Sequence, residues 1–236
     1  MSYLPLGPTG FPHRASASEN PVAVIGHHQQ DSTHIAANVI TLGLTQGPLK
    51  VEASTFHGRE PDEKRWNTNK GKPDSFATRL TVAPHKSFSA QFSAGRINNP
   101  EALDPTLDTV RTGGSVHHNI ESSTGHVASS IIWGRNKNLK NGSRRVFNSY
   151  NFETTAKFWN RHWVWTRIEN ADRDRTLLRS CRFRRDSKKT GNWKVTGANY
   201  WLRFGGLRKR WMFGSHRWIK KSTSWAETFW RRFESR

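Results

Sequence analysis

The sequence is poor in sulfur and has no long apolar run. Cys181 is the single cysteine among 236 residues, which excludes an internal disulfide framework and a zinc site built on several cysteines. No stretch approaches 18 consecutive apolar residues, which excludes a membrane-spanning helix. Residues 1–5 contain neither a charged region nor an apolar stretch. We therefore expect no signal peptide here and no export of this product.

Acidic residues are also scarce. The chain has 18 Asp and Glu against 38 Lys and Arg, a formal charge of +20, and such an excess usually indicates nucleic acid or an anionic surface as partner. The excess is uneven, because residues 179–236 hold 17 of the basic side chains, 3 of the acidic ones and 6 of the 11 tryptophans. Residues 1–178 are only mildly basic, so the net charge says little about their partner.

Alternation of apolar and polar residues is the main pattern of residues 35–178. In 88–95 and 149–158 the two kinds alternate at every step, which places them on opposite faces of a β-strand. We predict eight strands, each pairing antiparallel with its sequence neighbours, at 35–45, 49–57, 75–83, 88–96, 109–120, 127–135, 149–159 and 163–170.

The connections between these strands alternate in length. Short turns follow the odd-numbered strands, and long polar loops follow the even-numbered ones, at 58–73, 98–108 and 136–148. This arrangement is typical of an up-and-down outer-membrane barrel, although a soluble meander would show it too. The predicted fold class is all-β: an antiparallel up-and-down meander of about eight strands, a partial or small barrel of the outer-membrane type.

Several long motifs occur in order over residues 3–178. They are Gly7-Pro8, Phe11-Pro12-His13-Arg14-Ala15-Ser16, Gly26-His27-His28-Gln29-Gln30-Asp31-Ser32-Thr33-His34-Ile35, Phe56-His57-Gly58-Arg59-Glu60-Pro61-Asp62-Glu63, Asn99-Pro100-Glu101-Ala102-Leu103, Ile132-Trp133-Gly134-Arg135-Asn136 and Thr166-Arg167-Ile168-Glu169-Asn170. Together they resemble an uncharacterised family of bacterial proteins that look like outer-membrane β-barrels. The resemblance implies, for an intact member, a place in the outer membrane, contact with its lipid, and further strands on both sides. It implies no activity.

After Leu178 the sequence becomes rich in Arg, Lys, Trp and Ser and loses its alternation. We favour a frameshift as the cause, which makes 179–236 an irregular tail outside the native fold. The alternative is a functional basic tail, because interleaved Arg and Trp bind nucleic acid through phosphate contacts and base stacking. The chain thus divides into a loop segment at 1–34, a meander at 35–178 and this tail.

A histidine cluster just before the first predicted strand is the one feature that suggests a site. Imidazole and carboxylate groups suit Zn or Cu, and the loop at 58–73 is expected at the same end of the sheet. Capping of the strand entry would also explain the cluster, as would a polar outside loop rich in His and acidic residues that binds nothing. The candidate ligands are His27, His28, Asp31, His34 and His57.

A Gly-Arg pair recurs where three predicted strands end, at spacings of 37 and 39 residues. We expect the glycines to let the backbone leave the sheet and the arginines to form a rim beside the long loops, for solubility or selectivity. The candidate rim residues are Arg59, Arg96, Arg135 and Arg167.

No catalytic motif is recognisable in the sequence: there is no Gly-x-Ser-x-Gly elbow, P-loop or dinucleotide fingerprint. We therefore predict a non-enzymatic membrane pore or structural envelope protein, with a surface metal site as an option and no nucleic-acid partner. The alternative is a basic nucleic-acid-binding protein that acts through residues 179–236.

Overall fold

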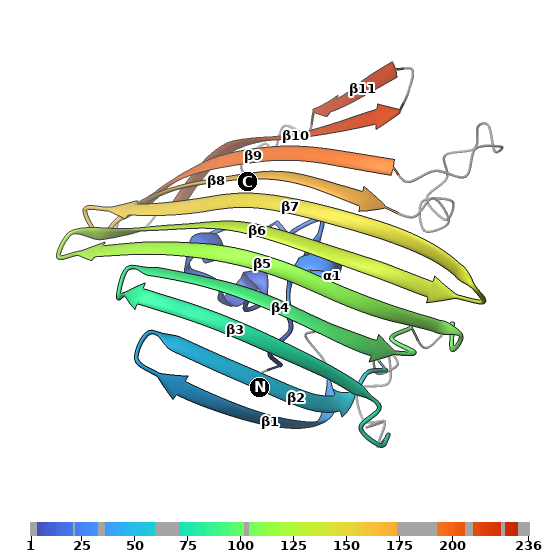
Figure 1. Ribbon diagram of the computed structural model, residues 1–236. Helices are drawn as coiled ribbons and strands as arrows, with labels where there is room; N and C mark the ends of the chain where they lie inside the picture. The colour runs from blue at the N-terminus through green and yellow to red at the C-terminus, as the bar shows by residue number, and fades with distance from the viewer. Residues whose placement is uncertain are drawn as a thin grey trace.

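The computed structural model of the chain describes residues 4–20, 22–32, 36–59, 71–101, 104–173, 193–205, 210–222 and 225–230. These residues form one antiparallel sheet of eleven strands, in which every strand pairs with its sequence neighbours (Figure 1). The strands are β1 (Ala37–Gln46), β2 (Leu49–His57), β3 (Ser75–His85), β4 (Phe88–Asn98), β5 (Leu107–Ser122), β6 (Gly125–Lys140), β7 (Ser143–Phe158), β8 (His162–Arg173), β9 (Trp193–Gly205), β10 (Arg210–Ser222) and β11 (Trp225–Trp230). The sheet is open, with β1 and β11 at its two edges.

The all-β, up-and-down meander predicted from the sequence is confirmed by strands β1 to β8. One expected loop is wrong: residues 136–148 do not form a long connection. Instead β6 continues to Lys140 and β7 begins at Ser143. Asn141 and Gly142 join them with φ of 46° and 78°. Positive φ at both central residues is the signature of a type I′ hairpin turn, which Asn-Gly favours.

Three strands lie within the segment that was predicted to be irregular. β9 pairs with β8 from Trp193 opposite Arg173 to Phe204 opposite His162, and β10 and β11 continue the same ladder. The expectation of an irregular tail is therefore wrong for these backbone segments. The frameshift hypothesis concerns the gene and stays a prediction.

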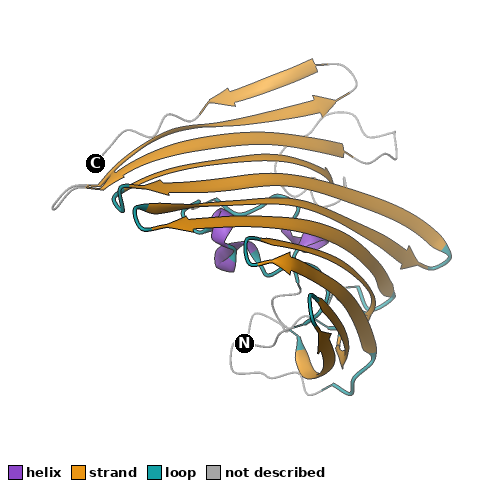
Figure 2. Ribbon diagram, turned by 60° about the vertical axis from the view of Figure 1, so that its left-hand side comes forward, coloured by secondary structure: helices purple, strands orange, loops and turns teal. Residues whose placement is uncertain are grey.

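Residues 4–20 and 22–32, called the N-terminal segment below, lie on the inner side of the curved sheet (Figure 2). The segment contains two short 3₁₀ helices, η1 (Phe11–His13) and η2 (Ala15–Ala17), and one helical turn, α1 (His27–Gln30). η2 contacts β6 and β7, and α1 contacts β5, β6 and β7. The sequence predicted a loop beside the strand entry, whereas the segment covers the middle of the sheet.

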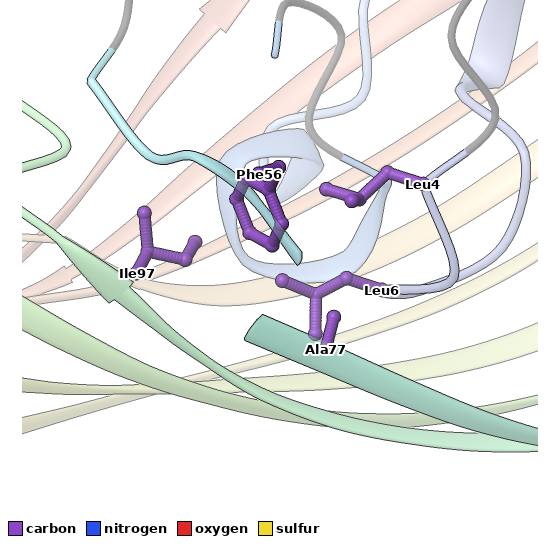
Figure 3. Packing of buried hydrophobic residues seen from close by; sticks show 5 residues of the cluster. All are labelled: Leu4, Leu6, Phe56, Ala77 and Ile97. Atoms are coloured by element: carbon purple, nitrogen blue, oxygen red, sulfur yellow. The ribbon is translucent and has the colours of Figure 1, made fainter. Parts of the chain in front are cut away.

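A small apolar cluster anchors one end of the N-terminal segment. Leu4 and Leu6 pack against Phe56 of β2, Ala77 of β3 and Ile97 of β4 (Figure 3). All five side chains are at most 1% exposed, and burying a side chain such as Leu stabilises a fold by about 1.5–3 kcal/mol. Apolar burial therefore fixes the start of the segment.

The two faces of the sheet differ sharply in polarity. The inner face is polar and covered, and its buried side chains include Glu52, Ser54, Arg79, Ser93, Arg111, Ser115, Ser130, Asn151, Glu153 and Arg167. The outer face exposes large apolar side chains, among them Ile40, Leu42, Leu44, Val51, Phe76, Leu80, Phe92, Ile131, Phe152 and Ile168. This is the reverse of a soluble sheet, in which the covered face is apolar. None of the described helices is long and apolar enough to cross a membrane.

Candidate functional site

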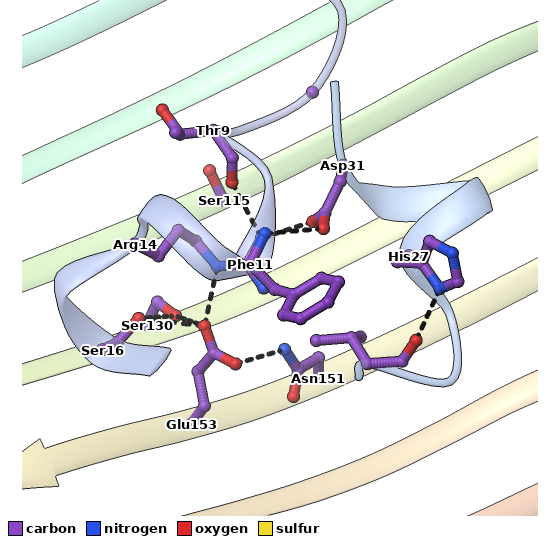
Figure 4. A network of polar contacts seen from close by, with 12 residues as sticks. Thr9, Phe11, Arg14, Ser16, His27, Asp31, Ser115, Ser130, Asn151 and Glu153 are labelled. Carbon is purple, nitrogen blue, oxygen red and sulfur yellow. Dashed lines mark hydrogen bonds and ion pairs between the residues drawn. The ribbon is translucent and has the colours of Figure 1, made fainter. Parts of the chain in front are cut away.

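Arg14 is the centre of a polar network between the N-terminal segment and the sheet (Figure 4). Its Nε donates to Glu153 Oε1 of β7 at 2.7 Å, and its Nη1 donates to the backbone oxygen of Thr9 at 2.9 Å. Nη1 also forms an ion pair with Asp31. The Arg14 side chain is only 2% exposed, and a buried charge of this kind needs such partners. The network therefore connects residues 9, 14 and 31 to one point on the inner face of the sheet.

Glu153 joins this network to a second arginine on the next strand. Arg167 Nε donates to Glu153 Oε2 at 3.0 Å, and Arg167 Nη1 lies 3.8 Å from Glu169 Oε1. Ser16 and Ser130 also donate their hydroxyls to Glu153 Oε1, and Asn151 Nδ2 donates to Glu153 Oε2 at 3.2 Å. Asp31, Glu153 and Glu169 thus share two guanidinium groups, all of them buried.

The charge balance of this cluster shifts the pKa values of its groups in the N-terminal segment. Burial is the largest influence on Asp31 and raises the pKa of its carboxyl, against the opposing effect of Arg14. Burial would lower the pKa of Arg14, but Asp31 and Glu153 outweigh it and raise that pKa. Arg14 therefore remains a cation at any physiological pH.

Side chains on the inner face of the sheet also bind backbone groups of the N-terminal segment. Arg79 Nη1 donates to the oxygen of Gly7 at 3.2 Å, and Thr155 Oγ1 donates to the oxygen of Ser16 at 2.9 Å. Arg111 Nη1 donates to the oxygen of Asp31 at 3.2 Å. Such bonds satisfy irregular backbone that would otherwise be buried without partners. The segment is therefore fastened along its length.

Two of the repeated glycines serve this contact. A Cβ on Gly134 would lie 2.2 Å from the backbone oxygen of Gln29, and one on Gly95 would lie 2.7 Å from the oxygen of Phe76 and 3.0 Å from Leu6. Both glycines lie inside strands β6 and β4 rather than at their ends. Their expected role of releasing the backbone from the sheet is therefore wrong. Gly134 instead allows the backbone of α1 to approach β6 closely.

The candidate metal ligands do not converge in the described part of the chain. Asp31 is paired with Arg14, whereas His57 Nδ1 lies 3.0 Å from Asp74 Oδ2 at the end of β2. The rings of His27 and His28 lie 4.0 Å apart, and His34 lies outside the described residues. No group of three or more His, Cys, Asp or Glu within the described ranges is arranged to hold a metal ion. The surface metal site stays a prediction.

The structure separates the four candidate rim arginines into two sets. Arg59, Arg96 and Arg135 are exposed, and Arg96 pairs with Asp108 at 2.8 Å. Arg167 is fully buried on the inner face, where it holds Glu153. Arg59 lies just after the end of β2, whereas Arg96 and Arg135 lie within β4 and β6, and the long loop expected beside Arg135 does not form. The rim of arginines stays a prediction, and Arg167 belongs to the internal network.

The internal network was not predicted from the sequence. Arg14 appeared only within a motif, and Glu153 appeared only as a polar step in an alternating strand. One sequence pattern could have indicated it. Charged residues share a strand face with glycine and serine, and large apolar residues occupy the other face, as Arg79 and its neighbour Leu80 show on β3. Charges on the covered face indicate an interior that holds polar partners.

Fold and site together define an open antiparallel meander with an apolar outer face and a polar inner face covered by its own N-terminal segment. No family model, curated protein or solved structure matches the chain.

Proposed function

We propose that this chain is a non-enzymatic protein of the bacterial outer membrane, in which the sheet forms a barrel wall and the N-terminal segment fills the interior. The observation that supports this most is the polarity of the two faces. Membrane barrels alternate apolar residues toward lipid with polar residues toward the interior. Leu80 and Thr81 are neighbours on β3 that follow this alternation, as do Phe92 and Gln91 on β4.

The energetic argument favours lipid over water on the outer face. Leu42 and Leu44 of β1 are 76% and 83% exposed, and Ile131 of β6 is 61% exposed. A sheet face with so many exposed large apolar side chains is rare on monomeric soluble proteins, since each side chain costs free energy in water. Lipid removes this cost, because acyl chains are as apolar as the side chains themselves.

Aromatic residues at one end of the sheet fit the same proposal. Phe158, Trp159 and His162 gather at the tight turn between β7 and β8, with ring centroids 5.3 to 5.9 Å apart. Trp159 is 70% exposed. Amphipathic rings favour the boundary between lipid and water, so this turn would lie at one membrane surface.

The filled interior favours a structural or gated role over an open pore. Arg14 of the N-terminal segment and Glu153 of β7 form a buried ion pair. Bonds from Arg79 of β3, Arg111 of β5 and Thr155 of β7 hold the segment across the inner face. A permanently open channel would need this segment to leave.

Spin labelling of the full chain in lipid vesicles tests the proposal. Cys181 is replaced by serine, and a nitroxide is attached to Leu80→Cys or, as the matched control, to Thr81→Cys. We expect the label at 80 to collide mainly with oxygen, which dissolves in lipid, and not with a water-soluble nickel complex. The label at 81 should be shielded from lipid. Preference for the nickel complex at 80 would overturn the membrane location.

A further inference from the structure

A cavity of about 310 Å³ lies between the N-terminal segment and the inner faces of β3, β4, β5 and β6. Its polar lining includes Thr9, His13, Arg14, Arg79, Gln91 and His117. Among the described residues that line it there is no aspartate or glutamate. The carboxylates that pair with the two arginines, Asp31, Glu153 and Glu52, are not among the lining residues, so the described lining consists of neutral and cationic side chains.

Arg14 is one of the residues that line this cavity, and its side chain carries an unused donor. Its Nε and Nη1 are occupied by Glu153, Thr9 and Asp31, but its Nη2 is buried without a hydrogen-bond partner. A buried donor without a partner costs free energy, and an entering acceptor would recover it. Because the other two nitrogens are held in place, Nη2 is positioned in advance.

Neighbouring groups add to the preference for an anion. Arg79 also lines the cavity, and Glu52 Oε2 holds its guanidinium in place through Nε at 2.9 Å and Nη2 at 2.7 Å. His117 of β5 is also fixed, with Nε2 2.8 Å from Ser115 Oγ. Guanidinium groups bind carboxylate and phosphate oxygens through short, charge-assisted hydrogen bonds.

We infer that this cavity binds a small oxyanion, a carboxylate or a phosphate group, at the guanidinium of Arg14. The volume is at the lower end of the range for small-molecule sites, about 300–1,000 Å³, so the ligand is small. The inference concerns the inner face alone. It is therefore independent of the membrane location and can fail separately.

Calorimetric titration of the full chain in non-ionic detergent micelles tests the site, with inorganic phosphate, acetate and glucose as probes at matched chloride concentration. We expect saturable binding of phosphate or of both anions, and none of glucose. Binding of phosphate alone would indicate phosphate esters as the natural ligand, and binding of both would indicate oxyanions generally. Absence of saturable anion binding, or equal binding of glucose, would overturn the inference.

A matched pair of variants places the binding in this cavity. Ser89, which lies opposite His117 in the β4–β5 ladder, also lines the cavity. Ser89→Asp adds a negative charge there, and Ser89→Asn adds the same bulk without charge. We expect the first to weaken anion binding about tenfold or more and the second to leave it within about twofold. Equal binding by both variants would overturn the site.

A second variant and a second readout guard against a misfolded Ser89→Asp protein. Thr81→Asp introduces the same charge from β3, and it is interpreted in the same way. In the unmodified chain, the ring protons of His117 should shift in NMR spectra as phosphate or acetate is added, with the affinity that calorimetry gives. No shift of these protons at saturating anion would contradict binding here.

Discussion

Single residues show how closely the N-terminal segment packs against the inner face of the sheet. Gly134 is the clearest case, because any side chain there would meet the backbone of α1 rather than a movable side chain. Backbone atoms cannot rotate away as a lysine chain can, so the whole helix would have to shift. Position 134 thus requires glycine because α1 packs closely against it, and not because the backbone turns there.

We expect Gly134→Ala to lower the free energy of unfolding by about 1–3 kcal/mol, as overpacking does elsewhere. Gly114→Ala on β5 is the matched control, since its Cβ would meet nothing closer than 3.5 Å. Urea unfolding in detergent measures both. Proteolysis should also cut the N-terminal segment faster in Gly134→Ala. An equally small change in both variants would contradict the packing role.

Asp74 orders the loop end of β2 and β3. Its Oδ1 accepts from Gly58 N at 2.9 Å and from Ser75 Oγ at 2.6 Å, and its Oδ2 faces His57. Burial alone would raise the pKa of Asp74, but the bonds from Ser75 and Gly58 together with the His57 ring lower it. The carboxylate form is therefore the one that stabilises this end of the sheet.

This shift predicts a pH dependence of stability. Because the pKa of Asp74 is lower in the folded chain than its ordinary 3.8, its stabilising effect is complete above about pH 4 and is lost as the pH falls below that value. Asp74→Asn should cost about 1 kcal/mol at pH 7. The difference in unfolding free energy between wild type and variant should shrink toward pH 2. A difference that stays constant with pH would contradict the prediction.

At the scale of elements, the N-terminal segment is held to the sheet by a few buried charges. Removing one partner of such a pair leaves the others buried and uncompensated, which costs far more than losing an exposed pair. The exposed pair of Lys140 and Asp104, at 2.6 Å, offers a comparison, with the lysine side chain 51% exposed.

Arg14→Met should therefore lower the free energy of unfolding by about 3–5 kcal/mol, whereas Lys140→Met should change it by less than about 1 kcal/mol. Urea unfolding measures both, and limited proteolysis reports whether the segment has left the sheet. Similar losses for the two variants would mean that Arg14 does not hold the segment.

At the scale of the whole molecule, the open sheet has two edge strands, each with one side unpaired. Unpaired strands invite association with other chains. The ladder from β8 to β9 is as regular as those within residues 37–173, with twelve consecutive partners. Strands β9 to β11 therefore cover an edge of the sheet that a chain ending at 178 would leave open.

Truncation after residue 178 tests both this role and the nucleic-acid alternative. We expect the truncated chain to aggregate more readily, as measured by light scattering, because β8 becomes an edge. Gel shift with single-stranded DNA gives the second readout. If only the full chain binds DNA, and truncation leaves aggregation unchanged, the basic segment is a binding tail and not part of the sheet.

The positions of the eight strands were predictable from the sequence because alternation is a local property. Each residue of Leu49–His57 or Ser75–His85 reports its face through its own polarity and that of its immediate neighbours. The Asn141-Gly142 turn was also predictable, because Asn-Gly is a local signature of a hairpin turn. It was missed because residues 136–148 were assigned to one long loop.

The sequence by itself determined strands β1 to β8, their order and the existence of one apolar and one polar face. Only the tertiary structure decided that the N-terminal segment covers the polar face, that Arg14 meets Glu153 139 residues away, and that Asp31 pairs with Arg14 instead of joining His57. The physical reason is range. Alternation depends on neighbours in the chain, whereas a buried ion pair depends on how the curved sheet brings distant residues together. The same carboxylate can therefore be a surface ligand or an internal counter-ion with no difference in its local sequence.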